Sequence, residues 1–195
     1  MHPSARLLRR SIVAVVVVMA LGAALATPAG AATDPEEWGD TFCTATVGWL
    51  TGASQGIDQL LTDAFDPTLT AADGKQLILG FLGTGVDATK AYGKAVKAAG
   101  VPDIRNGAKI QAAILAGINE STANLAALEK AAKKMPLEPA AAYKKSVNKI
   151  GNQFSAFSDP WTKGMNKAGK LDKGTQLGDI LATLPACAQL AGGSP

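Results

Sequence analysis

The sequence predicts an all-α protein, an antiparallel bundle of about five helices in which one disulfide joins the first helix to the C-terminal segment. Three observations support this fold class. Apolar residues recur every three to four positions along most of the chain, which is the period of an amphipathic helix. No sustained alternation of apolar and polar residues indicates a strand. The chain has two cysteines, Cys43 and Cys187, which lie far apart in the sequence.

The start of the chain has the order of a secretory signal peptide. Three arginines precede an apolar run over residues 12–25, and a proline and small residues follow it. This run is shorter than the roughly 20 residues of a bilayer-spanning helix. We therefore expect a signal peptide over residues 1–32, cleaved after Ala31 or Ala32, with no transmembrane segment after its removal. An uncleaved anchor and export by the twin-arginine route stay open as alternatives.

The remaining residues 33–195 are expected to form a single helical-bundle domain that is secreted, either extracellular or in the cell envelope. The chain has 19 Lys and Arg against 16 Asp and Glu, and three arginines leave with the signal, so the net charge of this domain is zero. A general attraction to nucleic acid is therefore not expected. His2 is the single histidine and leaves as well, which excludes histidine-based catalysis.

The cysteines are expected to form a structural disulfide, Cys43–Cys187. Exported cysteines normally pair, whereas a zinc site needs more thiol or imidazole ligands than this chain has. A C-x-x-C redox motif is absent, and no histidine is left to activate a reactive thiol. The pairing requires the first helix to lie beside the C-terminal segment.

The first helix is expected to begin after Asp34, which can cap it, and to end near Phe65. Pro35 suits the first helical position, and acidic residues in the first turn suit the helix dipole. Its predicted apolar seam is Cys43, Val47, Leu50, Ser54, Ile57 and Leu61, widened by Trp38, Phe42, Trp49 and Leu60.

The second helix is expected to begin with a capping box from Thr70 to Asp73 and to end at Gly100. Four glycines interrupt its apolar positions: Gly80, Gly83, Gly85 and Gly93. We interpret "GFLGTG" at residues 80–85 as a helix-packing run, because the lysine and hydroxyl residue of a phosphate-binding loop are missing. A ligand cleft is the less favoured use of these glycines.

The rest of the chain predicts three further helices. Asp103 is expected to cap the third, whose apolar stripe continues to Met135 and is broken by two prolines. A fourth helix follows, in which Ser158-Asp159-Pro160 indicates a new start or a kink. Residues 167–174 are expected to be a polar loop before a short last helix over residues 177–184.

The charges indicate a possible contact surface. Residues 33–89 hold nine acids and one lysine, whereas residues 90–195 hold fourteen lysines and Arg105 against seven acids. A basic surface could contact anionic cell-wall polymer or lipid headgroups, and the alternative is that these lysines solvate the outer faces of helices. The candidate residues are Lys144, Lys145, Lys149, Lys163, Lys167 and Lys170.

The sequence favours a non-catalytic binding or interaction module of the cell envelope or extracellular medium. It shows no catalytic motif, no cofactor or metal motif, and a single arginine, Arg105, after the signal, whereas clamping an anionic substrate takes several arginines. The alternative is a secreted enzyme, a hydrolase or lyase that uses carboxylates and lysines.

The layout resembles uncharacterised small secreted helical proteins of actinobacteria, the high-GC Gram-positive bacteria. An Ala- and Val-rich signal, "DTFCTATVGWL" at residues 40–50, "AAGVPDIRNG" at residues 98–107 and "LPACAQL" at residues 184–190 carry this resemblance. It implies export and a helical fold, and it implies no catalytic residue.

The disulfide can be tested by thiol titration. Denatured, unreduced protein taken after export is expected to show no free thiol, because both cysteines are oxidised. The same protein after reduction should titrate two thiols and serves as the control. Two free thiols before reduction would remove the predicted crosslink.

Overall fold

The protein is an all-α bundle, as predicted. The computed structural model of the chain describes residues 32–64, 69–173 and 176–191, so the expected signal segment up to residue 31 lies outside the described residues. In chain order the helices are α1 (Pro35–Ala64), α2 (Ala71–Ala98), α3 (Gly107–Lys133), α4 (Ala140–Phe154), α5 (Asp159–Asp172), α6 (Leu177–Thr183), α7 (Pro185–Ala188) and the 3-10 helix η1 (Gln189–Ala191).

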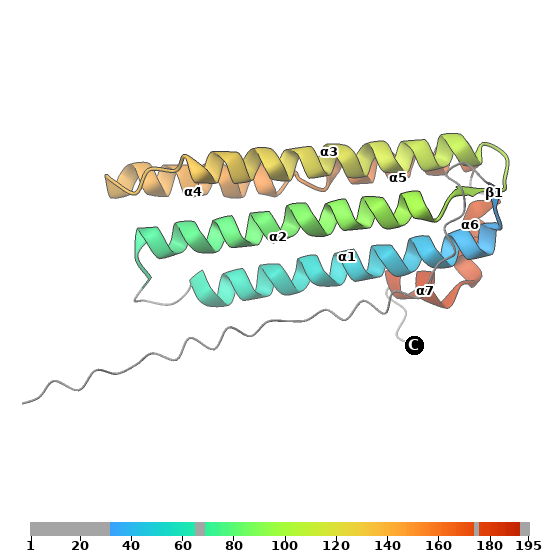
Figure 1. The fold of residues 1–195 in the computed structure, drawn as a ribbon, viewed down its shortest axis with the longest axis horizontal. Helices are drawn as coiled ribbons and strands as arrows, with labels where there is room; N and C mark the ends of the chain where they lie inside the picture. The colour runs from blue at the N-terminus through green and yellow to red at the C-terminus, as the bar shows by residue number, and fades with distance from the viewer. Residues whose placement is uncertain (1–31, 65–68, 174–175, 192–195) are drawn as a thin grey trace, which may run out of the picture.

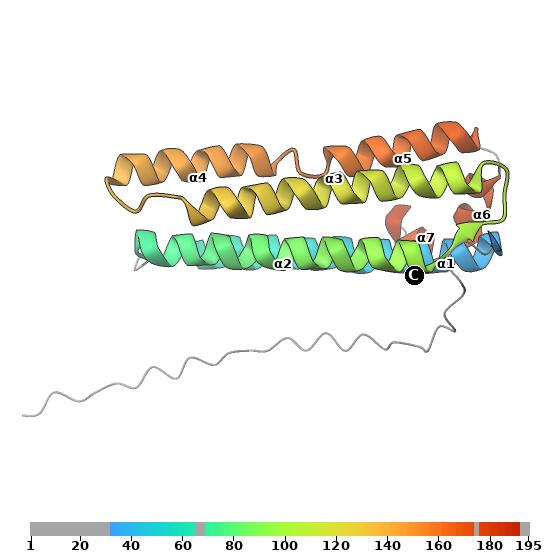
Figure 2. The same cartoon turned by 45° about the horizontal axis from the view of Figure 1, so that its top comes forward.

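The long helices form one bundle, in which α4 and α5 together take the place of a fourth long helix. α1, α2 and α3 run along the bundle, each packed on the next, and α4 and α5 lie end to end against α3 (Figures 1 and 2). The short helices α6 and α7 pack against α1. The segment that was expected to hold a new start or a kink is a new start, because α4 ends at Phe154 and α5 begins at Asp159.

The predicted disulfide joins α1 to α7. The Sγ atoms of Cys43 and Cys187 are 2.00 Å apart and their Cα atoms 5.0 Å apart. The two segments also touch one turn earlier on α1, where a Cβ atom added to Gly39 would lie 2.6 Å from Leu184 Cδ1. The first helix therefore lies beside the C-terminal segment, as the pairing requires.

Two short strands add a feature that the sequence pattern does not predict. β1 (Ala32–Thr33) and β2 (Val101–Pro102) pair in parallel, with Ala32 opposite Val101. The Asp103 amide continues this pairing and donates to the Thr33 carbonyl oxygen at 2.8 Å. The start of the domain is thus fastened to the α2–α3 connection.

Three of the four predicted caps are confirmed. Asp34 Oδ1 accepts the Glu36 amide at 2.9 Å, the capping box of Thr70 and Asp73 is present, and Gly100 ends α2 with a φ of 81°. Asp103 as a cap is wrong, because its amide is taken up by the strand pairing and α3 begins only at Gly107, after Asn106.

The predicted polar loop at residues 167–174 is wrong over residues 167–172, which are the last turns of α5. Their composition is polar because one face of the helix is exposed, while Ala168 and Asp172 are buried. The Asp172 carboxylate accepts the amides of Leu177 and Gly178 at 3.0 and 3.1 Å, and so connects the end of α5 to the start of α6.

The apolar seam predicted for α1 is wrong at Leu50 and Leu61. Trp38, Phe42 and Trp49 face the core and Ile57 and Leu60 are half-buried, whereas Leu50 is 40% exposed and Leu61 is 51% exposed. The reason is that α1 carries apolar residues on two faces, one toward α2 and α3 and one toward α7 at Cys43.

The tightest helix contact brings the backbones of α3 and α5 together. A Cβ atom added to Gly117 would lie 2.6 Å from the Pro160 carbonyl oxygen, and one added to Gly164 would lie 2.8 Å from the Ala113 carbonyl oxygen. Real Cβ atoms do not approach backbone oxygens so closely, so both positions require glycine at this separation of the helices.

Gly164→Ala tests this crossing. We expect a loss of about 1–3 kcal/mol in the free energy of unfolding, since the new methyl group pushes α5 away from α3. The matched control is Gly169→Ala on the same helix, where an added Cβ meets nothing within 4 Å and helix propensity predicts a gain of up to about 1 kcal/mol. Urea unfolding measures both variants, and equal effects would contradict the assigned contact.

Candidate functional site

A slot of about 350 Å³ lies between α1 and α2 and reaches down to the aromatic core; we call it the α1–α2 slot. Glycines line both of its sides, Gly52 and Gly56 on α1 and Gly80 and Gly85 on α2. Its volume lies within the range of about 300–1,000 Å³ that is typical of small-molecule pockets.

Two of the four glycines of the slot leave space open, whereas an added Cβ atom would lie 3.4 Å from Phe81 Cε2 at Gly56 and 3.8 Å from Leu125 Cδ1 at Gly85. A Cβ atom added to Gly52 or Gly80 would meet nothing within 4 Å. The helix-packing interpretation is therefore wrong for Gly80, and also for Gly83, which faces open space outside the slot. It holds for Gly93, where an added Cβ would lie 3.1 Å from Ile118 Cγ2.

The floor of the slot is a connected set of aromatic rings. Phe81 lies edge-on to Phe154 with 5.1 Å between ring centroids, and Phe154 stacks on Phe157 at 4.8 Å. Trp49 continues the set, 6.4 Å from Phe157. The Trp49 indole donates to Thr89 Oγ1 at 3.1 Å, so this polar group at the floor already has a partner. A ligand reaching the floor therefore meets apolar surface.

Behind the floor lies a buried polar cluster around Tyr92. Its hydroxyl is 3.0 Å from Thr46 Oγ1 and accepts the Trp161 indole N–H at 3.3 Å. Burial raises the pKa of the Tyr92 hydroxyl above its ordinary value, and the hydrogen bonds with Thr46 and Trp161 offset part of this rise. Trp161 is thus half-buried and packs against the core.

The C-terminal half of α1, from residue 50 on, leaves apolar surface uncovered next to the slot. None of the residues from 50 to 63 is buried, although several of them are apolar. Within the described chain, α1 and α4 are not among the closely packed helix pairs. This half of α1 therefore rests on α2 without a helix closing over it.

A second cavity of about 510 Å³ adjoins the slot, and we call it the outer cavity. Leu60 and Leu77 line both spaces. On its far side α4 contributes Tyr143, Lys144 and Val147. The slot and the outer cavity therefore adjoin at Leu60 and Leu77, and the outer cavity brings Lys144 near the apolar slot.

The slot offers no acid–base pair. Among the described residues that line it, Asp63 is the one ionisable side chain, and its Oδ1 accepts the Gln59 side-chain amide at 2.8 Å. Catalysis by a carboxylate and a lysine needs both groups to face one another in a shared site.

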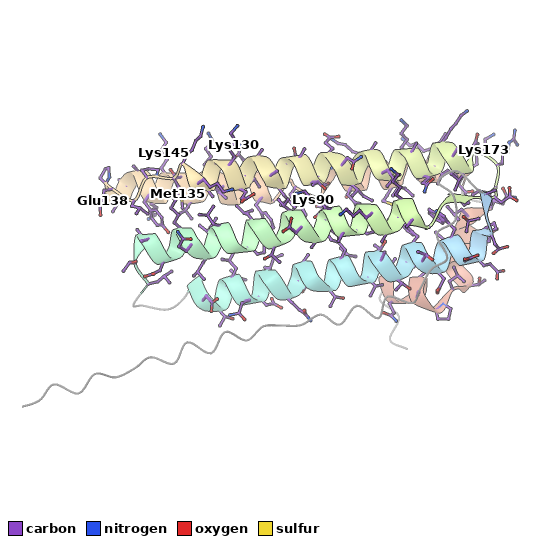
Figure 3. The ribbon with its side chains drawn as sticks, viewed as in Figure 1. Lys90, Lys130, Met135, Glu138, Lys145 and Lys173 are labelled. Atoms are coloured by element: carbon purple, nitrogen blue, oxygen red, sulfur yellow. A yellow bond between two sulfur atoms is a disulfide. The ribbon has the colours of Figure 1, made fainter. Side chains whose placement is uncertain are left out.

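The six lysines named from the sequence are all exposed, but they do not share one surface. Lys144 lines the outer cavity, whereas Lys149 lines a shallow groove between α3 and α4. Lys163 and Lys167 lie together in a groove between α3 and α5, beside Glu120. The remaining two, Lys145 and Lys170, lie on the exposed faces of α4 and α5. Lys145 projects away from the bundle (Figure 3).

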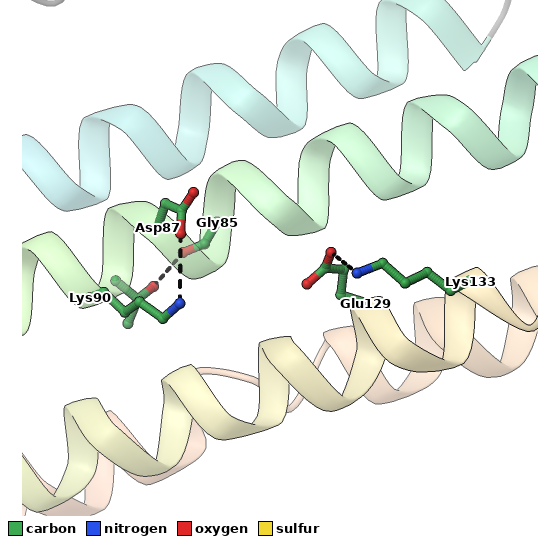
Figure 4. Close-up of polar contacts among 6 residues, drawn as sticks. Gly85, Asp87, Lys90, Glu129 and Lys133 are labelled. Carbon is green, nitrogen blue, oxygen red and sulfur yellow. Dashed lines mark hydrogen bonds and ion pairs between the residues drawn. The ribbon is translucent and has the colours of Figure 1, made fainter.

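The ion pairs that the structure shows do not connect different helices. Lys90 pairs with Asp87 at 3.7 Å and Lys133 with Glu129 at 2.6 Å, each within one helix (Figure 4). Within the described ranges, none of the six lysines makes an ion pair. They are therefore available to solvent or to a ligand.

The described residues show neither a cluster of metal-ligating side chains nor a membrane-spanning helix. They contain no group of three or more His, Cys, Asp or Glu side chains placed to hold a metal ion. None of their helices combines the length and the hydropathy that crossing a bilayer requires. Comparisons with protein-family models, with curated proteins and with solved structures gave no match. The function is therefore argued from the geometry of the slot.

Tyr92→Phe tests the buried cluster through its pH dependence. Because the pKa of Tyr92 is raised in the folded protein, its contribution to stability is full below pH 10 and is lost as pH rises through the raised value. We expect the variant to lose about 1 kcal/mol of unfolding free energy near neutral pH, and the difference from wild type to shrink as the pH rises above the ordinary pKa of tyrosine. Chemical unfolding followed by tryptophan fluorescence gives both values. A difference that stays constant with pH would contradict the assignment.

Proposed function

We propose that the chain is an exported, non-catalytic binding protein whose α1–α2 slot takes up an apolar small molecule. The signal-like start of the sequence and the resemblance to secreted actinobacterial proteins support export. The disulfide supports it independently, since such crosslinks persist in oxidising compartments outside the cytosol.

The observation that carries the proposal is a slot with glycine walls and an aromatic floor. Glycine walls let a ligand approach the helix backbones closely, and the floor of Phe81, Phe154 and Phe157 offers apolar contact. Each square ångström of apolar surface that a ligand removes from water there contributes about 25 cal/mol. Because the Thr89 hydroxyl at the floor is already hydrogen-bonded, an apolar ligand leaves this buried donor with its partner.

The lining also separates this proposal from the alternative of a carboxylate- and lysine-dependent enzyme. The slot contains Asp63 but no lysine. Glu120 does lie near lysines in the α3–α5 groove, but these side chains are exposed, whereas catalytic acid–base pairs are usually desolvated. The binding function therefore accounts better for the shape and the chemistry of the slot.

Gly80→Leu tests the function by filling the slot. We expect the variant to bind the fluorescent apolar probe N-phenyl-1-naphthylamine at least about tenfold more weakly than wild type, because the new side chain occupies the space of the ligand. The matched control is Gly83→Leu on the same helix, which also has free space but does not line the slot, and it should bind like wild type.

Both leucines replace glycine at positions where an added Cβ meets nothing within 4 Å, so both variants are expected to fold. Circular dichroism melting checks this point. Binding that is equal in the two variants would place the probe elsewhere, and no binding by wild type would refute the proposed function.

A further inference from the structure

We propose that the ligand of the α1–α2 slot is a single-chain anionic amphiphile, with its chain in the slot and its acidic head at Lys144. This inference rests on the proposed function and assigns the ligand class. It is carried by three observations: the continuity of the two cavities, the charges along their walls, and the limited volume of the slot.

The cavities form a path that suits a chain with one polar end. The slot reaches Phe157 at its floor, and it meets the outer cavity at Leu60 and Leu77, which line both spaces. The outer cavity continues it with apolar side chains, among them Ile78 and Val147. A linear hydrocarbon chain fits such a path because it needs apolar contact along its length and no hydrogen-bond partner.

The far end of the path favours a negative charge. Lys144 is exposed there and makes no ion pair within the described chain. The Tyr143 hydroxyl, which lies against Gly74, offers a second donor to an acidic head. The other nearby lysine, Lys75, is already engaged, because its ammonium group donates to the Met135 carbonyl oxygen at 2.8 Å.

The acids near the path fix the direction of the ligand. Asp63 lines the slot, so an acidic head placed there would meet a like charge. Asp73 lies near the outer cavity and also carries a negative charge, but the outer cavity holds Lys144, whereas among the described residues no cationic side chain lines the slot. The head therefore belongs at Lys144 and the chain in the slot, and not the reverse.

The volume argues against a peptide ligand. One turn of an α-helix with its side chains, about 10 Å across and 5.4 Å long, fills roughly 420 Å³, which exceeds the slot. An extended peptide would bring backbone N–H and C=O groups against glycine, leucine and phenylalanine, where most of them would find no partner. A hydrocarbon chain has neither problem.

Displacement of N-phenyl-1-naphthylamine by laurate and by 1-dodecanol, which share a chain length but differ in charge, tests the assignment. In wild type we expect laurate to displace the probe more effectively than dodecanol. Lys144→Gln should weaken laurate about threefold to fivefold and leave dodecanol unchanged, which is the scale of a solvent-exposed charge pair. The matched control is Lys145→Gln, whose side chain projects away from the bundle (Figure 3) and which should change neither ligand.

The outcomes separate this inference from the function on which it rests. If laurate and dodecanol compete equally and Lys144→Gln alters neither, the anionic head is refuted while the apolar slot stands. If both lysine variants weaken laurate equally, a diffuse charge effect replaces a head site at Lys144. If the probe does not bind wild type at all, the proposed function and the inference are refuted together.

Discussion

The site depends on one constraint: α1 is fixed to the rest of the fold through its N-terminal half. The disulfide from Cys43 to Cys187 joins the N-terminal half of α1 to the C-terminal segment. In the same half, the Trp38 indole donates to the Gly100 carbonyl oxygen at 3.1 Å. Below Trp49 no comparable contact buries α1. The C-terminal half of α1, after Trp49, therefore faces the glycines of α2 without close packing, and the space between the two helices is the slot.

Much of the fold could be predicted because its signals are local. The caps at Asp34 and Thr70 depend on residues within one helical turn, and periodicity identifies the helices themselves. Asp103 was misassigned because its role depends on pairing with Thr33, seventy positions earlier in the chain. The rotation of α1 could not be predicted either, since both of its apolar faces have helical spacing and periodicity cannot rank them.

The site was less predictable than the fold. The run of glycines at residues 80–85 was visible, but whether a helical glycine draws a neighbour close or leaves a gap depends on the facing side chain. Opposite Gly80 the facing stretch of α1 is itself glycine-rich, so the gap remains, whereas Ile118 fills the space at Gly93. The lysines were likewise visible, but their distribution over separate grooves follows from the packing of α4 and α5 on α3.

The position of the crosslink also decides what happens when the backbone is cut. Cys43 and Cys187 lie near the two ends of the domain, so every helix from α2 to α6 belongs to one covalent ring. A protease that cuts a single peptide bond inside this ring, for example at Leu137, which is 38% exposed between α3 and α4, opens the ring without releasing a fragment. Both pieces stay joined through sulfur, and the nicked protein can keep its core in surroundings where proteases are abundant.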